Sequence, residues 1–309
     1  MKIIVLGAGA MGSMYGSILS KRNEVWLVDI WKEHVDKINS EGLRLKISDT
    51  EEEIYHPHAT TNSADAGKAD LVIIFVKSVN TAAALEENKN IFHDDTMVLT
   101  LQNGYGNDED ILPYVKEDNL LIGTAAGGAT VLGPGHIFQA GRDLTTIGVR
   151  PGCSLASAQR VVDELNACGF PAVTSDNAME IVWKKLLVNV GCSAVCALLE
   201  KNNAFMDFSP SAYSIGLELI KEACAVAKAE GYTFDPEAIA VRYFHEGAKI
   251  VGKNRCAMLQ DVDRKRKTEI EKFNGAVARI GKKHGIPTPY NEVMLKLINA
   301  KEDGYNYEN

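Results

Sequence analysis

The sequence lacks the features that would direct it to a membrane or to nucleic acid. No apolar run reaches the roughly 18 residues of a membrane span, and the run 3–6 is shorter than the roughly 7 to 15 residues of a signal peptide. The net charge of -8 opposes binding to nucleic acid or anionic lipid, which attract basic surfaces. We therefore expect no nucleic-acid partner and no membrane partner.

The cysteines lack the spacing of a metal site. Among the six there is no C-x-x-C pair and no histidine at zinc-ligand spacing, so we expect free thiols and no metal. Free thiols without a signal peptide indicate a reducing, cytoplasmic setting. The one basic run, 264–267, is followed at once by two glutamates, which predicts a solvated helix face.

What the chain does have is enough material for two globular domains. Its 309 residues are 46% hydrophobic and 24% charged, and length alone favours about two domains of roughly 150 residues. A short apolar run at 3–6 is followed by a G-x-G-x-x-G turn and then by apolar residues at helical spacing. In such a turn the glycines let the backbone approach a pyrophosphate, which the helix N-terminus attracts. The predicted cofactor contacts are Gly7, Gly9, Ala10, Met11 and Gly12.

Asp29 ends a second predicted strand, 24–28, at the spacing from the glycine turn where a ribose-binding acid belongs. Its carboxylate accepts hydrogen bonds from the ribose hydroxyls of NAD and repels the 2′-phosphate of NADP, so the position favours NAD. NADP remains an alternative cofactor, because the positive charge of Lys32 offsets part of the repulsion between Asp29 and the 2′-phosphate.

Two more polar residues directly follow predicted strands. Lys77 follows the run 69–76, which is apolar on both faces as a central parallel strand must be, and Asn103 follows the strand 96–101. Ligands bind outside the carboxyl ends of parallel strands, so both are candidate site residues. Solvation of the strand ends, or a turn at Asn103-Gly104, is the alternative explanation.

After residue 176 the chain shows only helical patterns. A glycine- and threonine-rich stretch at 120–149 resembles hairpins, and a helix and a short strand follow it. Helical spacing then marks 177–199, 210–230, 236–251, 261–284 and 290–300. We predict an α/β fold, with an N-terminal Rossmann-type dinucleotide-binding domain at 1–176 and an all-helical substrate or dimerisation domain at 177–309.

A polar stripe crosses the first of these helices. Lys185, Asn189 and Ser193 are spaced i, i+4, i+8 and share one face, which we expect to border a cleft because buried polar groups need partners. Lys184 has only apolar neighbours at this spacing and is expected to reach the surface. Partial burial lowers the pKa of a lysine, which suits a proton donor, although a stabilising salt bridge is the alternative.

Glutamates at 269 and 271 could orient that lysine, and spacing does not distinguish them. The motifs together resemble the ketopantoate reductase family (2-dehydropantoate 2-reductases). They span nearly the whole chain in the family's order, and the last two are the most specific. The motifs are GAGAMG at 7–12, VK at 76–77, QNG at 102–104, WKKLLVN at 183–189 and MLQDVDRKRKTEIEKFNG at 258–275.

The resemblance implies an enzyme, an oxidoreductase of the pantothenate pathway that reduces 2-dehydropantoate to pantoate with NADPH. It implies that Lys185 is the general acid and that Glu269, which matches the family's T-E-I-D glutamate, acts with it. It also implies that Asn189 binds substrate, that Ser193 replaces a second asparagine, and that Asn103 and Lys77 lie near the nicotinamide and substrate.

Two departures from the family pattern leave alternatives open. Ala257 stands where the family often has a substrate-binding serine, and Asp29 with Ile30 stands where NADPH-dependent members carry an arginine. In this the chain is similar to NAD-dependent D-2-hydroxyacid dehydrogenases, which reduce branched or aromatic 2-oxo acids. A β-hydroxyacid dehydrogenase and a non-catalytic NAD-sensing protein are remoter alternatives. We expect a small 2-oxo acid as partner, and a homodimer is kept open.

Overall fold

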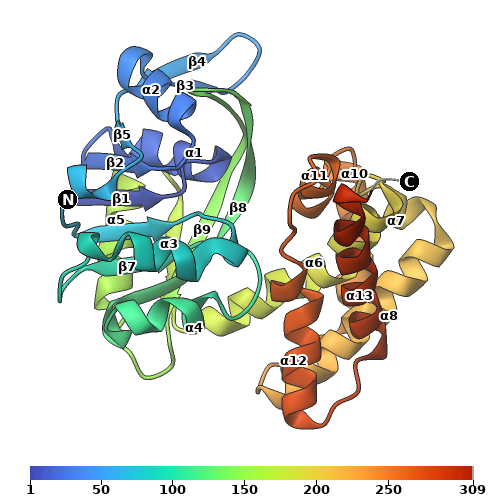
Figure 1. Cartoon of the computed structure of the whole chain (residues 1–309). Helices are drawn as coiled ribbons and strands as arrows, with labels where there is room; N and C mark the ends of the chain where they lie inside the picture. The colour runs from blue at the N-terminus through green and yellow to red at the C-terminus, as the bar shows by residue number, and fades with distance from the viewer. Residues whose placement is uncertain (308–309) are drawn as a thin grey trace. The chain divides into compact units, whose positions relative to one another are not determined.

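The computed structural model describes residues 1–307, which form two compact units (Figure 1). One unit consists of Met1–Gln102 and Asn107–Ile181, and the other of Asn103–Gly106 and Val182–Asn309. The contacts thus divide the chain after residue 181 rather than at 176, because the first turn of the long helix packs on the sheet. There, a Cβ added at Gly148 would lie 2.9 Å from the Cβ of Ala178.

The first unit is built on a ten-stranded sheet whose parallel part has Rossmann topology. In chain order its six parallel strands lie as 3-2-1-4-5-6, the order of a dinucleotide-binding fold, so the predicted fold class is confirmed. Across the sheet they are β5 (His58–Thr60), β2 (Glu24–Val28), β1 (Lys2–Leu6), β6 (Leu71–Ile74), β7 (Met97–Thr100) and β8 (Leu120–Gly133).

A long hairpin extends this sheet. β8 pairs antiparallel with β9 (His136–Val149), β9 pairs parallel with β3 (Leu43–Lys46), and β3 pairs antiparallel with β4 (Glu52–Tyr55). β10 (Ala172–Ser175) pairs parallel with residues 145–148 of β9, whereas β3 pairs with residues 136–138. Figure 1 shows the hairpin bending toward α2, β3 and β4. The glycine- and threonine-rich stretch is therefore the hairpin that the sequence suggested.

The core of this unit lies between the sheet and its helices α1 (Ala10–Leu19), α2 (Lys32–Glu41), α3 (Thr81–Glu87), α4 (Asn107–Ile111) and α5 (Ala156–Ala167). β6 and β7 are buried at every position, as expected of central parallel strands. Tyr15 of α1 is fully buried, and its hydroxyl lies 2.6 Å from Oγ1 of Thr145 on β9. This hydrogen bond ties α1 to the hairpin.

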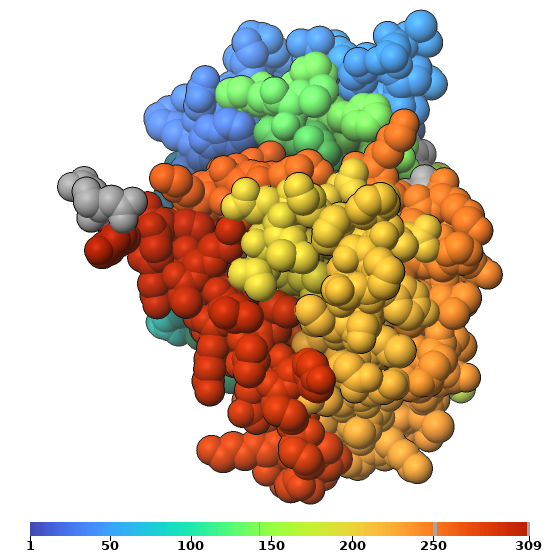
Figure 2. All heavy atoms as spheres, turned by 90° about the vertical axis from the view of Figure 1, so that its right-hand side faces the viewer, coloured from blue at the N-terminus to red at the C-terminus, as the bar shows by residue number. Residues whose placement is uncertain are grey.

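The second unit is helical. Side-chain caps at Ser209 and Asp235, each followed by proline, start α8 and α9. α8, α12 and α13 pack together, and Figure 2 shows α13 (red) beside α8 (gold). The elements are α6 (Ala178–Leu199), α7 (Phe205–Phe208), α8 (Pro210–Ala229), α9 (Pro236–Ala240), η6 (Val241–Glu246), α10 (Gly247–Val251), α11 (Ala257–Asp263), η7 (Ile270–Lys272), α12 (Asn274–His284) and α13 (Pro289–Asp303).

The prediction of one helix at 261–284 is wrong. α11 ends at Asp263, Lys265 has a positive φ of 51°, and the chain runs without helix until η7. The basic run is exposed as expected, but it lies in this non-helical stretch. Lysine, arginine and glutamate all favour helices, so the local pattern carried no sign of the break. As a result Glu269 lies directly before η7 instead of within a long helix.

α6 is the core helix of the second unit. Its length and mean hydropathy of 1.5 would suffice to cross a membrane, but 56% of the apolar window is buried inside the protein. A buried core helix can be equally long and apolar, and in α6 the side chains of Trp183, Leu187 and Val190 are fully buried. Its few polar side chains are therefore the feature of α6 that needs an explanation.

Candidate active site

The predicted site residues fall into two groups, one in each unit. The first unit carries the glycine turn with Asp29 and Lys77, at the carboxyl ends of β1, β2 and β6. The second unit carries the polar residues of α6 with Glu269, and it also contains Asn103, which follows β7.

The three glycines of the turn have different structural roles. Gly7 has a φ of 94°, and a Cβ there would lie 2.6 Å from the backbone nitrogen of Val76 after β6. A Cβ at Gly12 would lie 1.9 Å from the carbonyl oxygen of Gly7, so this glycine lets α1 pack on the turn. A Cβ at Gly9 would meet nothing within 4 Å. Gly9 is thus open on the side from which a phosphate would approach the start of α1.

Asp29 is tied to the glycine turn. The backbone N–H of Ala8 donates to its Oδ2 at 2.6 Å, and the N–H of Trp31 donates to its Oδ1 at 2.9 Å. The side chain is half-buried, while the neighbouring Ile30 is 93% exposed. Lys32, which could have favoured NADP, forms an exposed ion pair with Asp36 at 2.6 Å. Asp29 therefore stabilises the turn, and it lies at the end of β2, where the sequence predicts a ribose contact.

Two buried residues that support the glycine turn, Ser13 and His34, were not predicted from the sequence. The N–H of Gly135 donates to Nδ1 of His34 at 2.9 Å, so Nε2 carries the ring proton and faces Oγ of Ser13 at 3.1 Å. The Ser13 hydroxyl donates in turn to the carbonyl of Ala8 at 2.8 Å. Burial lowers the pKa of His34, which keeps this hydrogen-bonded chain in its neutral form. No local pattern indicates contacts across such separations.

The ends of β6 and β7 are fastened to each other next to the turn. The Gln102 amide donates to the carbonyl of Val76 at 2.7 Å and to the Thr81 hydroxyl at 2.8 Å. Lys77, one residue after Val76, is half-buried and precedes the short turn Ser78–Asn80. Lys77 therefore lies on the same edge of the sheet as the glycine turn.

On α6 the helical spacing separates the two lysines as expected. Lys184 is exposed, whereas Lys185 and Asn189 are half-buried and Ser193 is buried. Asn103, which the structure assigns to the same unit, is also half-buried. The apolar helix thus presents three polar side chains along one partly desolvated face.

Burial and charge shift the pKa of Lys185 in opposite directions. Burial lowers the pKa of its ammonium group to about 8, and the nearby carboxylate of Glu269 opposes that shift. Glu269 is only 6% exposed, whereas Glu271 is exposed and accepts a hydrogen bond from Asn299 at 3.1 Å. Spacing left these glutamates equivalent, and the geometry separates them. A lysine with such a pKa can donate a proton near neutral pH.

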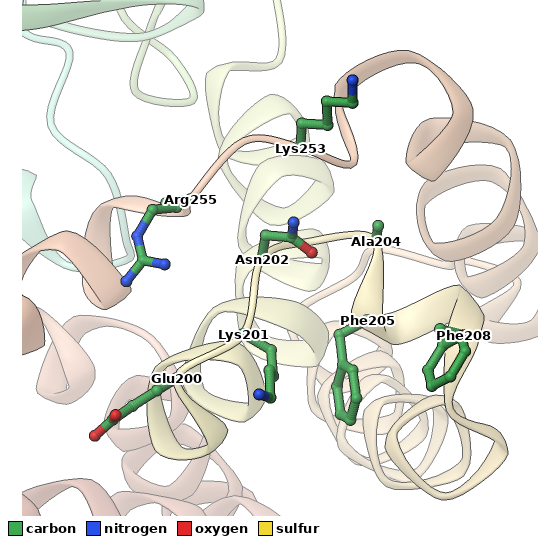
Figure 3. Close-up of a pocket in the computed structure, with 8 residues that line it drawn as sticks. All are labelled: Glu200, Lys201, Asn202, Ala204, Phe205, Phe208, Lys253 and Arg255. Atoms are coloured by element: carbon green, nitrogen blue, oxygen red, sulfur yellow. The ribbon is translucent and has the colours of Figure 1, made fainter.

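A hollow of about 580 Å³ on the helical unit contains none of these residues. In Figure 3, the rings of Phe205 and Phe208 lie on one side of the hollow and Arg255 with Glu200 on the other. Arg255 is paired with Asp263 at 2.5 Å, and Phe208 is 81% exposed. This hollow therefore has no part in the candidate site.

Comparison with known proteins connects both groups of residues to one family. The model of ketopantoate reductase PanE/ApbA matches residues 3–152, and the model of its C-terminal part matches residues 177–302. The 2-dehydropantoate 2-reductase of Lactococcus lactis subsp. lactis is 32% identical, with 98% of each chain covered, and that of Pyrococcus abyssi is 32% identical with the same coverage.

Solved structures with the same fold include two kinds of relatives. A D-mandelate dehydrogenase solved with NADH and anilino(oxo)acetate has a TM-score of 0.92 and 31% identity, and all of both chains is covered. A PanE/ApbA family ketopantoate reductase from Ralstonia eutropha JMP134 has a TM-score of 0.89 and 29% identity over 99% of this chain and all of its own.

The different surroundings of Gly9 and Gly12 lead to a stability prediction. Gly12→Ala should lower the free energy of unfolding by about 1 to 3 kcal/mol, because its Cβ would meet the Gly7 carbonyl. Gly9→Ala should change it by less than about 1 kcal/mol, because its Cβ enters open space. Urea unfolding of both variants without ligands measures the difference. Equal losses would contradict these roles.

Proposed function

We propose that this chain, which belongs to the ketopantoate reductase family, reduces a 2-oxo acid to the D-2-hydroxy acid, with 2-dehydropantoate as its substrate. The observation that carries the proposal is the half-buried Lys185, whose pKa is about 8, beside the buried Glu269. The names of relatives that match along the full chain support the choice of substrate. Free cysteines among the described residues support a cytoplasmic setting.

The residues of the first unit fit a nicotinamide dinucleotide. The open side of Gly9 at the start of α1 suits a pyrophosphate, and Asp29 suits a ribose. Ala10 and Met11 would contribute the first backbone N–H groups of α1, and Lys77 would lie near the nicotinamide. When bound, the reduced dinucleotide supplies the hydride.

The residues of the second unit handle the proton and the substrate. As negative charge develops on the substrate carbonyl oxygen, Lys185 donates a proton to it and becomes neutral. Glu269 favours the protonated form of Lys185 before the reaction. Asn103, Asn189 and Ser193 supply hydrogen bonds to the carboxylate or hydroxyl groups of the substrate.

A second candidate function is NAD-dependent reduction of branched or aromatic 2-oxo acids. Two observations favour it. Asp29 is an acid at the ribose position, and Ala257, the first residue of α11, offers a methyl group where the family often has a hydroxyl. The structural similarity to a D-mandelate dehydrogenase solved with NADH also supports this second candidate function.

Replacing the proposed proton donor gives the most direct test. Lys185→Ala should lower kcat by about 100-fold or more, the usual contribution of a general acid. The matched control is Lys184→Ala, which removes the exposed neighbour on the same helix and should leave kcat within about twofold. A folded Lys185→Ala enzyme that loses less than about threefold would contradict the assignment. Cofactor binding without turnover in the wild type would instead support an NAD-sensing protein.

The pH profile tests the partnership of Lys185 and Glu269. The reduction rate should fall above about pH 8, because Lys185 loses its proton there. Glu269→Gln removes the charge that raises the pKa of Lys185, so this alkaline limb should move to lower pH. Values of kcat/KM measured across the pH range locate the limb. If the alkaline limb lies at the same pH in Glu269→Gln as in the wild type, Glu269 does not raise the pKa of Lys185, and the proposed partnership is contradicted.

Initial rates with both cofactors test the substrate and the role of Asp29. The panel is 2-dehydropantoate, 2-oxoisocaproate, 2-oxoisovalerate and phenylglyoxylate, each with NADH and NADPH, and a 3-hydroxy acid checks for a β-hydroxyacid dehydrogenase. NADH should be preferred, and Asp29→Ala should reduce that preference by about tenfold, equivalent to about 1.4 kcal/mol. A wild-type preference for NADPH would leave Asp29 as a turn residue only. Faster turnover of phenylglyoxylate than of 2-dehydropantoate would favour the second candidate.

A further inference from the structure

The QNG motif is divided between the two units at a single peptide bond. Gln102 stays with the sheet through its hydrogen bonds to Val76 and Thr81. The next four residues, Asn103–Gly106, belong to the helical unit by their contacts. Asn103, a candidate substrate residue that follows a strand of the sheet, is therefore positioned by contacts with the helical unit.

Lys272 contacts this segment in three ways. Its carbonyl accepts a hydrogen bond from the N–H of Tyr105 at 2.9 Å, and its Nζ donates to the carbonyl of Gly106 at 3.0 Å. Gly104 lies directly against it, since a Cβ added there would be 2.6 Å from Lys272 Cβ and 2.8 Å from its carbonyl oxygen. The φ of Gly104 is 93°, a conformation that suits glycine. Backbone and side chain of one lysine thus hold three successive residues.

The segment is also anchored by its aromatic side chain. The ring of Tyr105 lies 5.0 Å from that of Trp183, with the planes tilted by 48°. Tyr105 is 9% exposed and Trp183 is fully buried. Trp183 lies two residues before Lys185 on α6. The segment is therefore packed beside the helix that carries the proposed proton donor.

Lys272 is connected to the other proposed catalytic residue through one short turn. It is the last residue of η7, and its N–H donates to the carbonyl of Glu269 at 3.0 Å. Ile270, between them, is buried with 1% exposure, which fixes the turn in the core. A displacement of Lys272 would consequently act on the carboxylate and on the Asn103 segment together.

We propose that Lys272 is a positioning residue, which holds Asn103 in register with Glu269 and Lys185 without touching the substrate itself. This inference rests on the proposed function, in which Asn103 binds the substrate. Loss of the Lys272 ammonium group should let the segment move, and the effect should be on substrate binding through Asn103. A role in general stability would instead lower the amount of active enzyme without changing its KM.

Hydrogen exchange tests the contact independently of catalysis. Lys272→Met keeps the aliphatic stem and the carbonyl but removes the hydrogen bond to Gly106. Exchange of the Tyr105 amide should become at least about tenfold faster, because local opening is easier. The matched control is Lys282→Met, which removes an exposed lysine from α12 and should leave this exchange unchanged. Unchanged exchange of residues 103–106 in Lys272→Met would overturn the proposal.

Kinetics test whether the effect passes through Asn103. Lys272→Met should raise KM for the 2-oxo acid about tenfold with a smaller change in kcat, and Lys272→Arg should restore most of it, since arginine can also donate to Gly106. In a double-mutant cycle with Asn103→Ala the two losses should not add, because both remove the same interaction. Fully additive losses, or an unchanged KM, would overturn the proposal.

A second variant changes the other side of this contact, so that the proposal remains testable if Lys272→Met does not fold. Gly104→Ala places a Cβ against Lys272 and should reproduce both the faster exchange and the raised KM. Normal exchange and a normal KM in this variant would count against the proposal. If the wild type reduces no 2-oxo acid at all, the proposed function fails by itself, and the exchange of residues 103–106 still decides whether Lys272 holds the segment.

Discussion

Holding a partly buried lysine ammonium group on an apolar core helix costs free energy, and a charge from outside that helix offsets part of the cost. α6 buries Trp183 and Leu187 completely and offers no acid near Lys185 on its own turns. The compensating charge comes from Glu269, which is itself buried. Each charge offsets part of the cost of burying the other, and removal of one withdraws that compensation. The pKa of about 8 is the balance between these two effects.

The dinucleotide side depends on backbone geometry far more than on side-chain charge. Gly7 and Gly12 allow close contacts that a Cβ would prevent, and the N–H and carbonyl of Ala8 are held by Asp29 and Ser13. His34 extends this support to the hairpin turn at Gly135. These contacts hold the turn in shape, so that the backbone N–H groups at the start of α1 can meet an anionic ligand.

The sequence predicted features whose causes are local and missed those whose causes are not. The glycine turn, an apolar strand within residues 69–76 and the two unlike lysines of α6 follow from spacing within a few residues. The break before η7 did not, because its residues favour helix, and the stretch after α11 is held by a distant residue, Glu302, which accepts the N–H of Thr268 at 2.8 Å. The assignment of Asn103 to the helical unit depends on Lys272, far away in the chain. Spacing alone carries no record of such contacts.

The proposed role of Asp29 would couple cofactor preference to the structure of the glycine turn. Its two oxygens accept the N–H groups of Ala8 and Trp31, so the same carboxylate that would meet a ribose also fixes the turn that would meet the pyrophosphate. An arginine at this position would remove a repulsion toward a 2′-phosphate, but it has no acceptor for these N–H groups. If Asp29 contacts the ribose as proposed, a substitution there that alters the cofactor preference also deprives the N–H groups of Ala8 and Trp31 of this acceptor. A second change that satisfies these groups would then be needed to preserve the turn.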